Sequence, residues 1–177
     1  NNYSSIYYSN SDVNNGMKKT VDVWYDNNLK DYENYIADTE FCEQFKVAHS
    51  SSYTTAGSAT APLYDSYISN FKCSTDENGK GILKLKIGLL TYDEIVHAGN
   101  HPSHVAIYTY LRKDKYYWLM SPDGIYSNQS RAYFSSDRGV PSSNPTNYTY
   151  TVLPVISLKP DTLATGSGTE TDPYIIK

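Results

Sequence analysis

The chain has little of several features that mark common classes of protein. Its 177 residues contain no run of 18 apolar residues, so we expect no membrane-spanning helix. Lysine and arginine number 15 against 19 aspartate and glutamate, and the resulting net charge of -4 lacks the basic surplus of a general nucleic-acid binder. Charged residues make up only 19% of the sequence, below the usual share of roughly 25%.

Tyrosine is the residue that the chain has in excess. There are 19 tyrosines against four phenylalanines and two tryptophans, and the aromatic content argues against disorder. Tyrosine gives a large amphipathic contact at a small cost in side-chain entropy, which is typical of recognition surfaces. It also suits half-buried β-strands, so composition alone leaves both interpretations open.

Two cysteines, Cys42 and Cys73, are the only ones in the chain. An even, minimal count favours one disulfide in an oxidising compartment, while two separate buried thiols are the alternative. The chain opens on the polar run NNYSSIYYSN without the apolar core of a signal peptide, so we expect a mature product or a trimmed domain.

The length predicts a single domain over residues 1–177, with an extended lead-in over residues 1–16. Apolar residues at three- and four-residue spacing predict a helix over residues 17–37, with Trp24 and Leu29 as its deepest anchors. A loop rich in Ser, Thr, Ala and Gly follows at residues 46–63, and loops of that length are usually functional or mobile.

A strand over residues 82–90 leads into a short second helix. Thr91 and Glu94 have the spacing of a capping box, and Gly99 closes the helix. Residues 108–111 and 116–120 alternate like a pair of antiparallel strands.

The remaining sequence predicts a turn-rich polar stretch over residues 121–150 and a final strand over residues 152–158. A C-terminal turn and short strand occupy residues 159–177. Together these patterns predict an α+β protein, with two main helices packed on small antiparallel sheets and long irregular loops.

Metal and thiol chemistry find weak support. His97, His101 and His104 lie close together and could bind zinc, but no carboxylate or cysteine motif completes the site, so we predict solvated loop histidines and no metal. Neither cysteine has the setting of a nucleophile. No cofactor is expected. Calcium stays a minor possibility because oxygen ligands are plentiful in the polar stretch, at Asp123, Asn128, Asp137 and Asn144.

The polar stretch is also the best candidate for a binding surface. Aromatic and arginine side chains are the usual anchors of recognition. We therefore predict ligand contacts at seven of its residues: Tyr126, Asn128, Arg131, Tyr133, Phe134, Arg138 and Tyr148. The alternative is an irregular loop pinned by its own aromatics.

Five segments, in order, resemble an uncharacterised domain family of Gram-positive bacterial surface proteins. They are TVDVWYDNNLKDYENYIADTEFC (20–42), IGLLTYDEIVHAG (87–99), YYWLMSP (116–122), LPVISLKP (153–160) and GSGTETDPYII (166–176). That family is similar to the C-type-lectin-like fold of formylglycine-generating enzymes and of the variable proteins of diversity-generating retroelements. The resemblance departs at Leu153, where the family usually has arginine.

The resemblance implies a C-type-lectin-like fold, a disulfide between Cys42 and Cys73, and a ligand face over residues 122–150. It implies no catalysis, because the catalytic cysteines of the related enzymes lie near the C-terminal part of the fold, whereas both cysteines here precede residue 74. The sequence therefore predicts a non-catalytic, extracellular, adhesin-like module at the bacterial cell surface that binds protein or glycan. A structural subunit of a pilus or other appendage, self-associating with its own copies, is the alternative.

Overall fold

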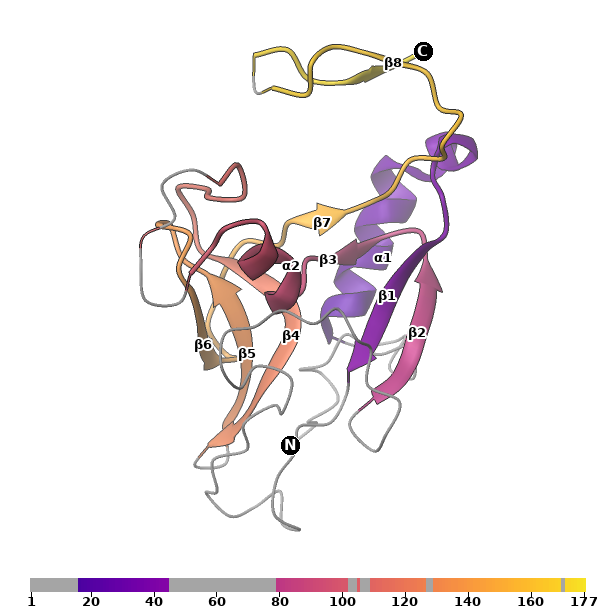
Figure 1. Ribbon diagram of the computed structural model, residues 1–177. Coiled ribbons are helices and arrows are strands. Elements are labelled where there is room, and N and C mark those ends of the chain that lie inside the picture. The colour runs from indigo at the N-terminus through magenta and orange to yellow at the C-terminus, as the bar shows by residue number, and fades with distance from the viewer. Residues whose placement is uncertain (1–15, 45–78, 102–104, 106–108, 127–128, 170) are drawn as a thin grey trace.

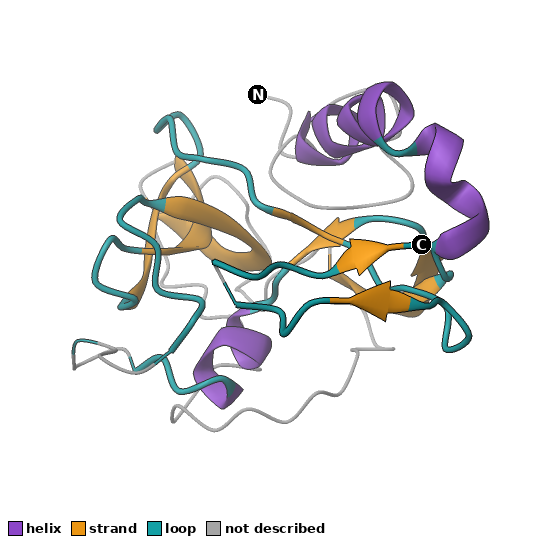
Figure 2. Ribbon diagram, turned by 90° about the horizontal axis from the view of Figure 1, so that it is seen from above, coloured by secondary structure: helices purple, strands orange, loops and turns teal. Residues whose placement is uncertain are grey.

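A computed structural model gives the arrangement of the chain (Figure 1) and describes residues 16–44, 79–101, 105, 109–126, 129–169 and 171–177. Within that part, small antiparallel sheets combine with two α-helices and a 3-10 helix. The strands lie between α1 on one side and α2 on the other (Figure 2). The predicted α+β class is confirmed. The lead-in and the loop at residues 46–63 lie outside the described residues, apart from Gly16.

Helix α1, Gly16–Asn28, buries the stripe formed by Met17, Val21 and Tyr25, which recur every four residues. Trp24, expected to be a deep anchor, is 43% exposed, so that prediction is wrong. The neighbouring Tyr25 takes the inward position instead, because it is in phase with Val21.

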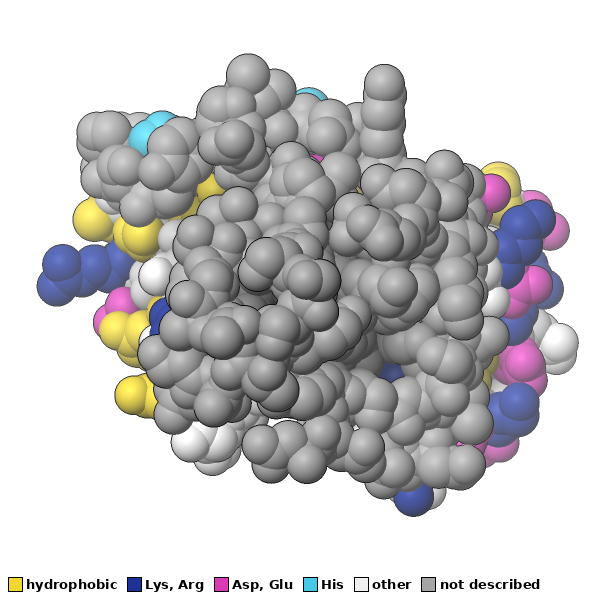
Figure 3. All heavy atoms as spheres, turned by 90° about the horizontal axis from the view of Figure 1, so that it is seen from below, with side chains coloured by type: hydrophobic (Ala, Val, Ile, Leu, Met, Phe, Trp, Pro, Cys, Tyr) yellow, Lys and Arg dark blue, Asp and Glu magenta, His cyan; other side chains and the backbone are white. Residues whose placement is uncertain are grey.

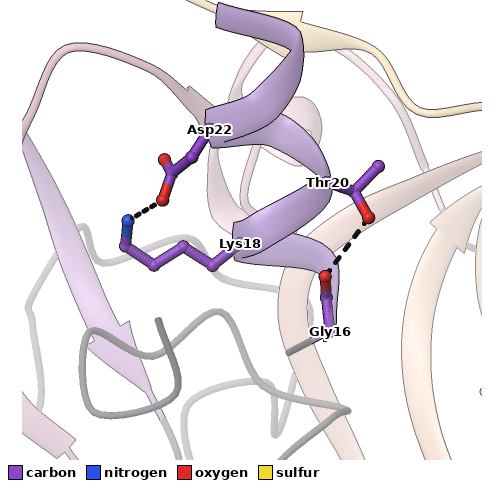
Figure 4. Close-up of polar contacts among 4 residues, drawn as sticks. All are labelled: Gly16, Lys18, Thr20 and Asp22. Carbon is purple, nitrogen blue, oxygen red and sulfur yellow. Dashed lines mark hydrogen bonds and ion pairs between the residues drawn. The ribbon is translucent and has the colours of Figure 1, made fainter. Parts of the chain in front are cut away.

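Two side-chain contacts support the first turns of α1. Lys18 forms an ion pair with Asp22 one turn along, and the Thr20 hydroxyl donates to the Gly16 carbonyl at 3.2 Å (Figure 4). Although Lys18 is buried, this pairing keeps its ammonium group next to a carboxylate.

The first helix does not continue to residue 37 as one α-helix. It ends at Asn28, and a 3-10 helix, η3, spans Lys30–Tyr35. Leu29 at the junction packs partly buried against the core. The Asn28 amide donates to the Trp24 carbonyl at 2.7 Å, the kind of side-chain competition with the backbone that makes asparagine a poor residue inside helices.

The predicted strand over residues 82–90 is divided between two sheets. Strand β2, Gly79–Leu85, pairs antiparallel with β1, Thr39–Gln44. Strand β3, Gly88–Leu89, pairs antiparallel with β7, Pro154–Val155. Within the predicted strand over residues 152–158, only these two residues of β7 form a strand. The chain bends at Lys86, whose ammonium group donates to the Ile36 carbonyl at 3.1 Å and lies 3.1 Å from an Asp38 carboxylate oxygen.

Helix α2, Tyr92–His97, confirms the predicted capping box. The Glu94 backbone N–H donates to the Thr91 hydroxyl at 3.2 Å, and the Thr91 backbone N–H donates to the Glu94 carboxylate at 2.7 Å. Gly99 follows with a φ of 102°, a left-handed conformation that ends the helix at low cost for glycine.

Residues 121–150 are more regular than their composition suggests. Strands β4 (Tyr117–Tyr126), β5 (Gln129–Ser135) and β6 (Pro141–Pro145) form one antiparallel sheet in that order. The expected pairing of residues 116–120 with residues 108–111 is wrong. Arg112 donates its backbone N–H to the Thr109 carbonyl in a turn, and β4 pairs with β5.

The C-terminal residues form a small hairpin of β8 (Ala164–Thr165) and β9 (Ile175–Ile176) that stands above the rest of the fold in Figure 1. The sequence predicted only one strand there. The segment before the hairpin is tied to η3, since the Lys159 backbone N–H donates to the Tyr35 carbonyl at 2.9 Å.

Among the described residues, the buried hydrophobic side chains form three clusters. The first joins α1 to β1 and β3 through Val21, Phe41 and Leu89, and the second joins α2 to β4 through Ile95 and Tyr117. The third consists of Trp118, Ala132 and Phe134 on the sheet of β4 and β5. Met17 packs against both the first and the third cluster, so α1 supports the sheet as well as the central core.

Candidate ligand-binding face

The sheet of β4, β5 and β6 presents two different faces, because successive side chains of a strand point to opposite sides. On one side, Tyr117 and Tyr133 pack on helix α2, with the Tyr133 ring 4.6 Å from that of Tyr92. On the other side, Trp118 and Phe134 are cross-strand partners whose rings meet edge to face at 6.3 Å. The second side carries the candidate site.

Five rings make up what we call the aromatic face: Tyr116, Trp118, Phe134, Tyr148 and Tyr150. Tyr150 is the centre of this group. Its ring centroid lies 4.7 Å from Trp118 and 4.9 Å from Phe134. Tyr116 stacks on it at 5.4 Å, and Tyr148 lies 6.1 Å away. Offset and tilted arrangements at these distances are the favourable ones for aromatic pairs.

Exposure increases from the base of the aromatic face to its rim. Trp118 and Phe134 are 7% and 6% exposed and belong to the core, and Tyr150 is half-buried. Tyr116 and Tyr148 are 43% and 53% exposed. Two tyrosines therefore show much of their surface to solvent while resting against other rings, which limits how far they can move.

Backbone hydrogen bonds fix the two segments that bring the tyrosines together. The Thr151 N–H donates to the Tyr116 carbonyl, and the Trp118 N–H donates to the Thr151 carbonyl, both at 3.0 Å. The Tyr148 N–H donates to the Pro145 carbonyl at 3.1 Å, which closes the turn after β6. The Asn144 amide also donates to the Tyr150 hydroxyl. The arrangement is thus held by the sheet and does not depend on a ligand.

The chain around Tyr148 and Tyr150 carries no charge. Residues 139–158 contain no Asp, Glu, Lys, Arg or His, although the whole chain has 34 charged residues, 15 basic and 19 acidic. Seen from below, charged and hydrophobic side chains both occur along the two margins (Figure 3). The segment that carries Tyr148 and Tyr150 is neutral, whereas Lys113, Asp114 and Lys115 directly precede Tyr116.

The predicted contact residues do not form one surface. Tyr148 belongs to the aromatic face. Phe134 belongs to it only as a buried base, and a ring that is 6% exposed has little area left for a ligand. Tyr133 packs on α2 from the opposite side of the sheet. Arg131, two residues earlier on the same side of β5, donates from Nε to the Ser143 hydroxyl at 3.3 Å and from Nη2 to the Ser143 carbonyl, so it joins β5 to β6.

Two of the other predicted contacts, Arg138 and Tyr126, lie at or just beyond the ends of strands of the sheet. Arg138 is exposed in the turn between β5 and β6, where the Ser136 hydroxyl accepts from the backbone N–H groups of Arg138 and Val140. For Tyr126 the structure describes only the backbone, paired with Gln129 at the end of β4. Asn128 lies outside the described residues.

Two rings of the aromatic face, Tyr116 and Trp118, lie outside the predicted ligand face over residues 122–150, whereas Tyr150 lies within it. Tyr116 and Trp118 are two residues apart at the start of a strand, so alternation alone places them on one side of the sheet. That signal was present in the sequence. The position of Tyr150 against them depends on the chain returning beside β4, where Thr151 bridges Tyr117, and no local pattern predicts this.

A polar cluster lies on the buried side of the sheet. The Tyr117 hydroxyl donates to the Leu111 carbonyl at 2.9 Å, and the Asn100 amide lies 3.5 Å from the Ser135 hydroxyl. Burial raises the pKa of Tyr117 above its ordinary value, while a hydrogen bond with Ser135 opposes that shift. This cluster anchors the segment before β4 to the sheet.

The predicted ion-binding residues are described only in part, and for Asp123 the structure gives the backbone alone. His97 ends α2 and His101 is exposed after it, while His104 lies outside the described residues. Among the calcium candidates, the Asn144 amide binds Tyr150 and the Asp137 carbonyl accepts from Arg112 at 3.4 Å. Within the part of the chain that is described, no group of three or more His, Cys, Asp or Glu side chains is placed to hold a metal ion.

The predicted disulfide falls outside what the structure describes. Cys73 is not among the described residues, and for Cys42 only the backbone is described, in β1 opposite Ile82. The pairing of these two cysteines stays a prediction.

No family model, curated protein or solved structure matches this chain. Among the described residues, no helix combines the length and the apolar character that crossing a membrane requires.

Proposed function

We propose that this chain is a non-catalytic, extracellular ligand-binding module of adhesin type, and that it holds a protein or a glycan on the aromatic face. The observation that carries the proposal is the pair of exposed rings, Tyr116 and Tyr148, which both lie against Tyr150. Tyr150 in turn packs on the buried Trp118 and Phe134. Exposed tyrosines on a rigid support bind with little loss of entropy, since their side chains are already ordered before the ligand arrives.

The resemblance to surface proteins of Gram-positive bacteria supports the same proposal. We propose a C-type-lectin-like arrangement as the finer description of the α+β fold, with a Cys42–Cys73 disulfide and a location at the cell surface. Tyr126, Asn128 and Arg138 remain proposed ligand contacts. Calcium is proposed neither as a cofactor nor as a ligand of the site.

The test is to replace the two rim tyrosines and measure binding to a panel of glycans and proteins. Tyr116→Ala and Tyr148→Ala together should abolish binding that the unmodified protein shows, with far-ultraviolet circular dichroism unchanged. Tyr32→Ala is the matched control, because Tyr32 is 55% exposed on η3. Equal binding by the double variant and the control would refute the site.

A structural subunit of a pilus or appendage is the second candidate, and the C-terminal hairpin favours it. Leu163, Tyr174 and Ile175 are 63–73% exposed there, an unusual display of apolar surface on a small projecting element. Light scattering at increasing concentration should then show assemblies that Ile175→Asp prevents. A monomer at every concentration would eliminate this candidate.

A further inference from the structure

We infer that the ligand of the aromatic face is a neutral saccharide, with one sugar ring lying flat against Tyr148 and its neighbour in the glycan chain reaching Tyr116. This inference rests on the proposed function and makes its ligand specific. It follows from three properties of the described residues: the shape of the exposed surface, its charge and its polar rim.

The shape favours a small ligand with an apolar side. The exposed parts of Tyr116 and Tyr148, 43% and 53%, together amount to about one tyrosine side chain, or roughly 250 Å². A protein partner normally buries about 800 Å² on each side of an interface. The C–H groups on one side of a pyranose ring match a phenol ring in size, and covering both removes apolar surface from water.

The charge argues against ionic ligands on the Tyr148 side of the face, while Lys113, Asp114 and Lys115 precede Tyr116 with mixed signs. Residues 139–158 supply Tyr148, Tyr150 and the strand beneath them without a single charged side chain. A nucleic acid, an anionic lipid surface or a strongly charged peptide is held mainly by opposite charges, which this segment does not have. A neutral saccharide can bind without any charged side chain.

The polar rim supplies what sugar hydroxyls require. Ser142 is exposed on β6 as the cross-strand partner of Phe134, and Asn147 and Thr149 are exposed on either side of Tyr148. Hydroxyl and amide groups both donate and accept, so they pair with sugar hydroxyls in either direction. An apolar ring surrounded by neutral donors and acceptors is thus complementary to a sugar ring with hydroxyls at its edge.

The experiment uses the full chain on an array of neutral, sialylated and sulfated glycans, together with enzymatically deglycosylated fibronectin and fibrinogen. Neutral glycans that bind are then titrated with four variants: Tyr148→Ala, Tyr148→Phe, Tyr116→Ala and Tyr32→Ala. We expect Tyr148→Ala and Tyr116→Ala each to weaken binding about tenfold or more. Tyr148→Phe should stay within about threefold, because the ring remains, and Tyr32→Ala should match the unmodified protein.

The other outcomes separate this inference from the proposed function. Binding only to the deglycosylated proteins, lost in Tyr148→Ala, would overturn the saccharide and leave the binding module standing. Binding only to sialylated or sulfated glycans would overturn the inference as well, because charge would then be the determinant. Absence of any binding that depends on Tyr116 or Tyr148 would overturn both.

Discussion

Tyr116 and Tyr150 stack with ring centroids 5.4 Å apart and planes inclined by 27°, although one residue precedes β4 and the other follows β6. The contact joins the beginning and the end of the segment that forms the three-stranded sheet. It also sets the position of the exposed Tyr116 ring, which lies 5.7 Å from Phe134 on the same side. The aromatic face is therefore a product of tertiary structure, and its stability can be measured separately from its binding.

Tyr150→Ala should lower the free energy of unfolding by about 2–3 kcal/mol, because the half-buried ring contacts four others and its removal leaves a gap among them. Tyr150→Phe keeps those contacts and loses only the hydrogen bond from Asn144, so about 1 kcal/mol is expected. Urea denaturation measures both. Equal losses for the two variants would mean that the hydroxyl, not the ring, holds the aromatic face together.

Gly88 is required for packing, since a methyl group at its Cα would come within 2.2 Å of Cε1 of the buried Phe41 ring. Gly88→Ala should cost about 2–3 kcal/mol through this overlap. The partner variant Phe41→Leu should absorb part of the loss, so the two changes together should cost less than their sum in a double-mutant cycle. Strict additivity would contradict a direct clash.

Gly99 provides a matched comparison, because no atom lies within 4 Å of the methyl group that alanine would place there. Its φ of 102° alone opposes substitution. Gly99→Ala should therefore cost about 1–2 kcal/mol, and Phe41→Leu should not change that cost.

The capping box of α2 should contribute measurably to the stability of the protein. Thr91→Ala removes the oxygen that accepts from the Glu94 N–H and should destabilise the protein by about 1 kcal/mol. Thr91→Ser retains a hydroxyl in the same place and should stay within about 0.5 kcal/mol of the unmodified protein. Thermal unfolding of the unmodified protein, Thr91→Ser and Thr91→Ala tests this order of stability. A loss for serine as large as for alanine would show that the threonine methyl group, and not the cap, is what matters.

The features that the sequence predicted well are local. The capping box needs only Thr91 and Glu94, and the left-handed glycine that ends the helix is five residues further on. Which residues of the first helix are buried was predicted less well. Tyr25 and Trp24 are adjacent and both aromatic, and only the phase with Val21, fixed by packing on Phe41 and Leu89, decides which of them is buried.

Residues 116–120 were predicted as a strand, but the third strand of the sheet, β6, was missed because it is poor in the residues that favour strands. Strand β6, PSSNP, has no β-branched or aromatic residue, and prolines at both ends suit its place at the edge of the sheet. Trp118 packs on Phe134 across the strands, and Tyr150 packs on Phe134. These tertiary contacts, and not local strand propensity, stabilise the sheet. Alternation along the strands then places Tyr116 on the side of Trp118 and Tyr133 on the side opposite to Phe134.

Two buried tyrosines predict how stability depends on alkaline pH. Burial raises the pKa of Tyr25, with a further rise from the nearby Glu33 carboxylate, and burial also raises the pKa of Tyr117. Below about pH 10, both tyrosines are neutral in the folded and unfolded chains, so their contribution is complete. As the pH rises further, the unfolded chain loses these protons first, and the free energy of unfolding falls until the folded-state pKa values are passed.

The double variant Tyr25→Phe with Tyr117→Phe should therefore lose less stability between pH 9 and pH 11 than the unmodified protein does, as measured by urea denaturation at each pH. The two single variants should differ in their free energy of unfolding at pH 7. Tyr117→Phe removes the bond to the Leu111 carbonyl and should cost about 1 kcal/mol, whereas the Tyr25 hydroxyl is buried without a hydrogen-bond partner among the described residues, so Tyr25→Phe should be neutral or stabilising. Parallel pH curves for the double variant and the unmodified protein would show that neither hydroxyl is buried in the folded state, and with that the packing of Tyr25 in the first cluster and of Tyr117 against α2 would have to be revised.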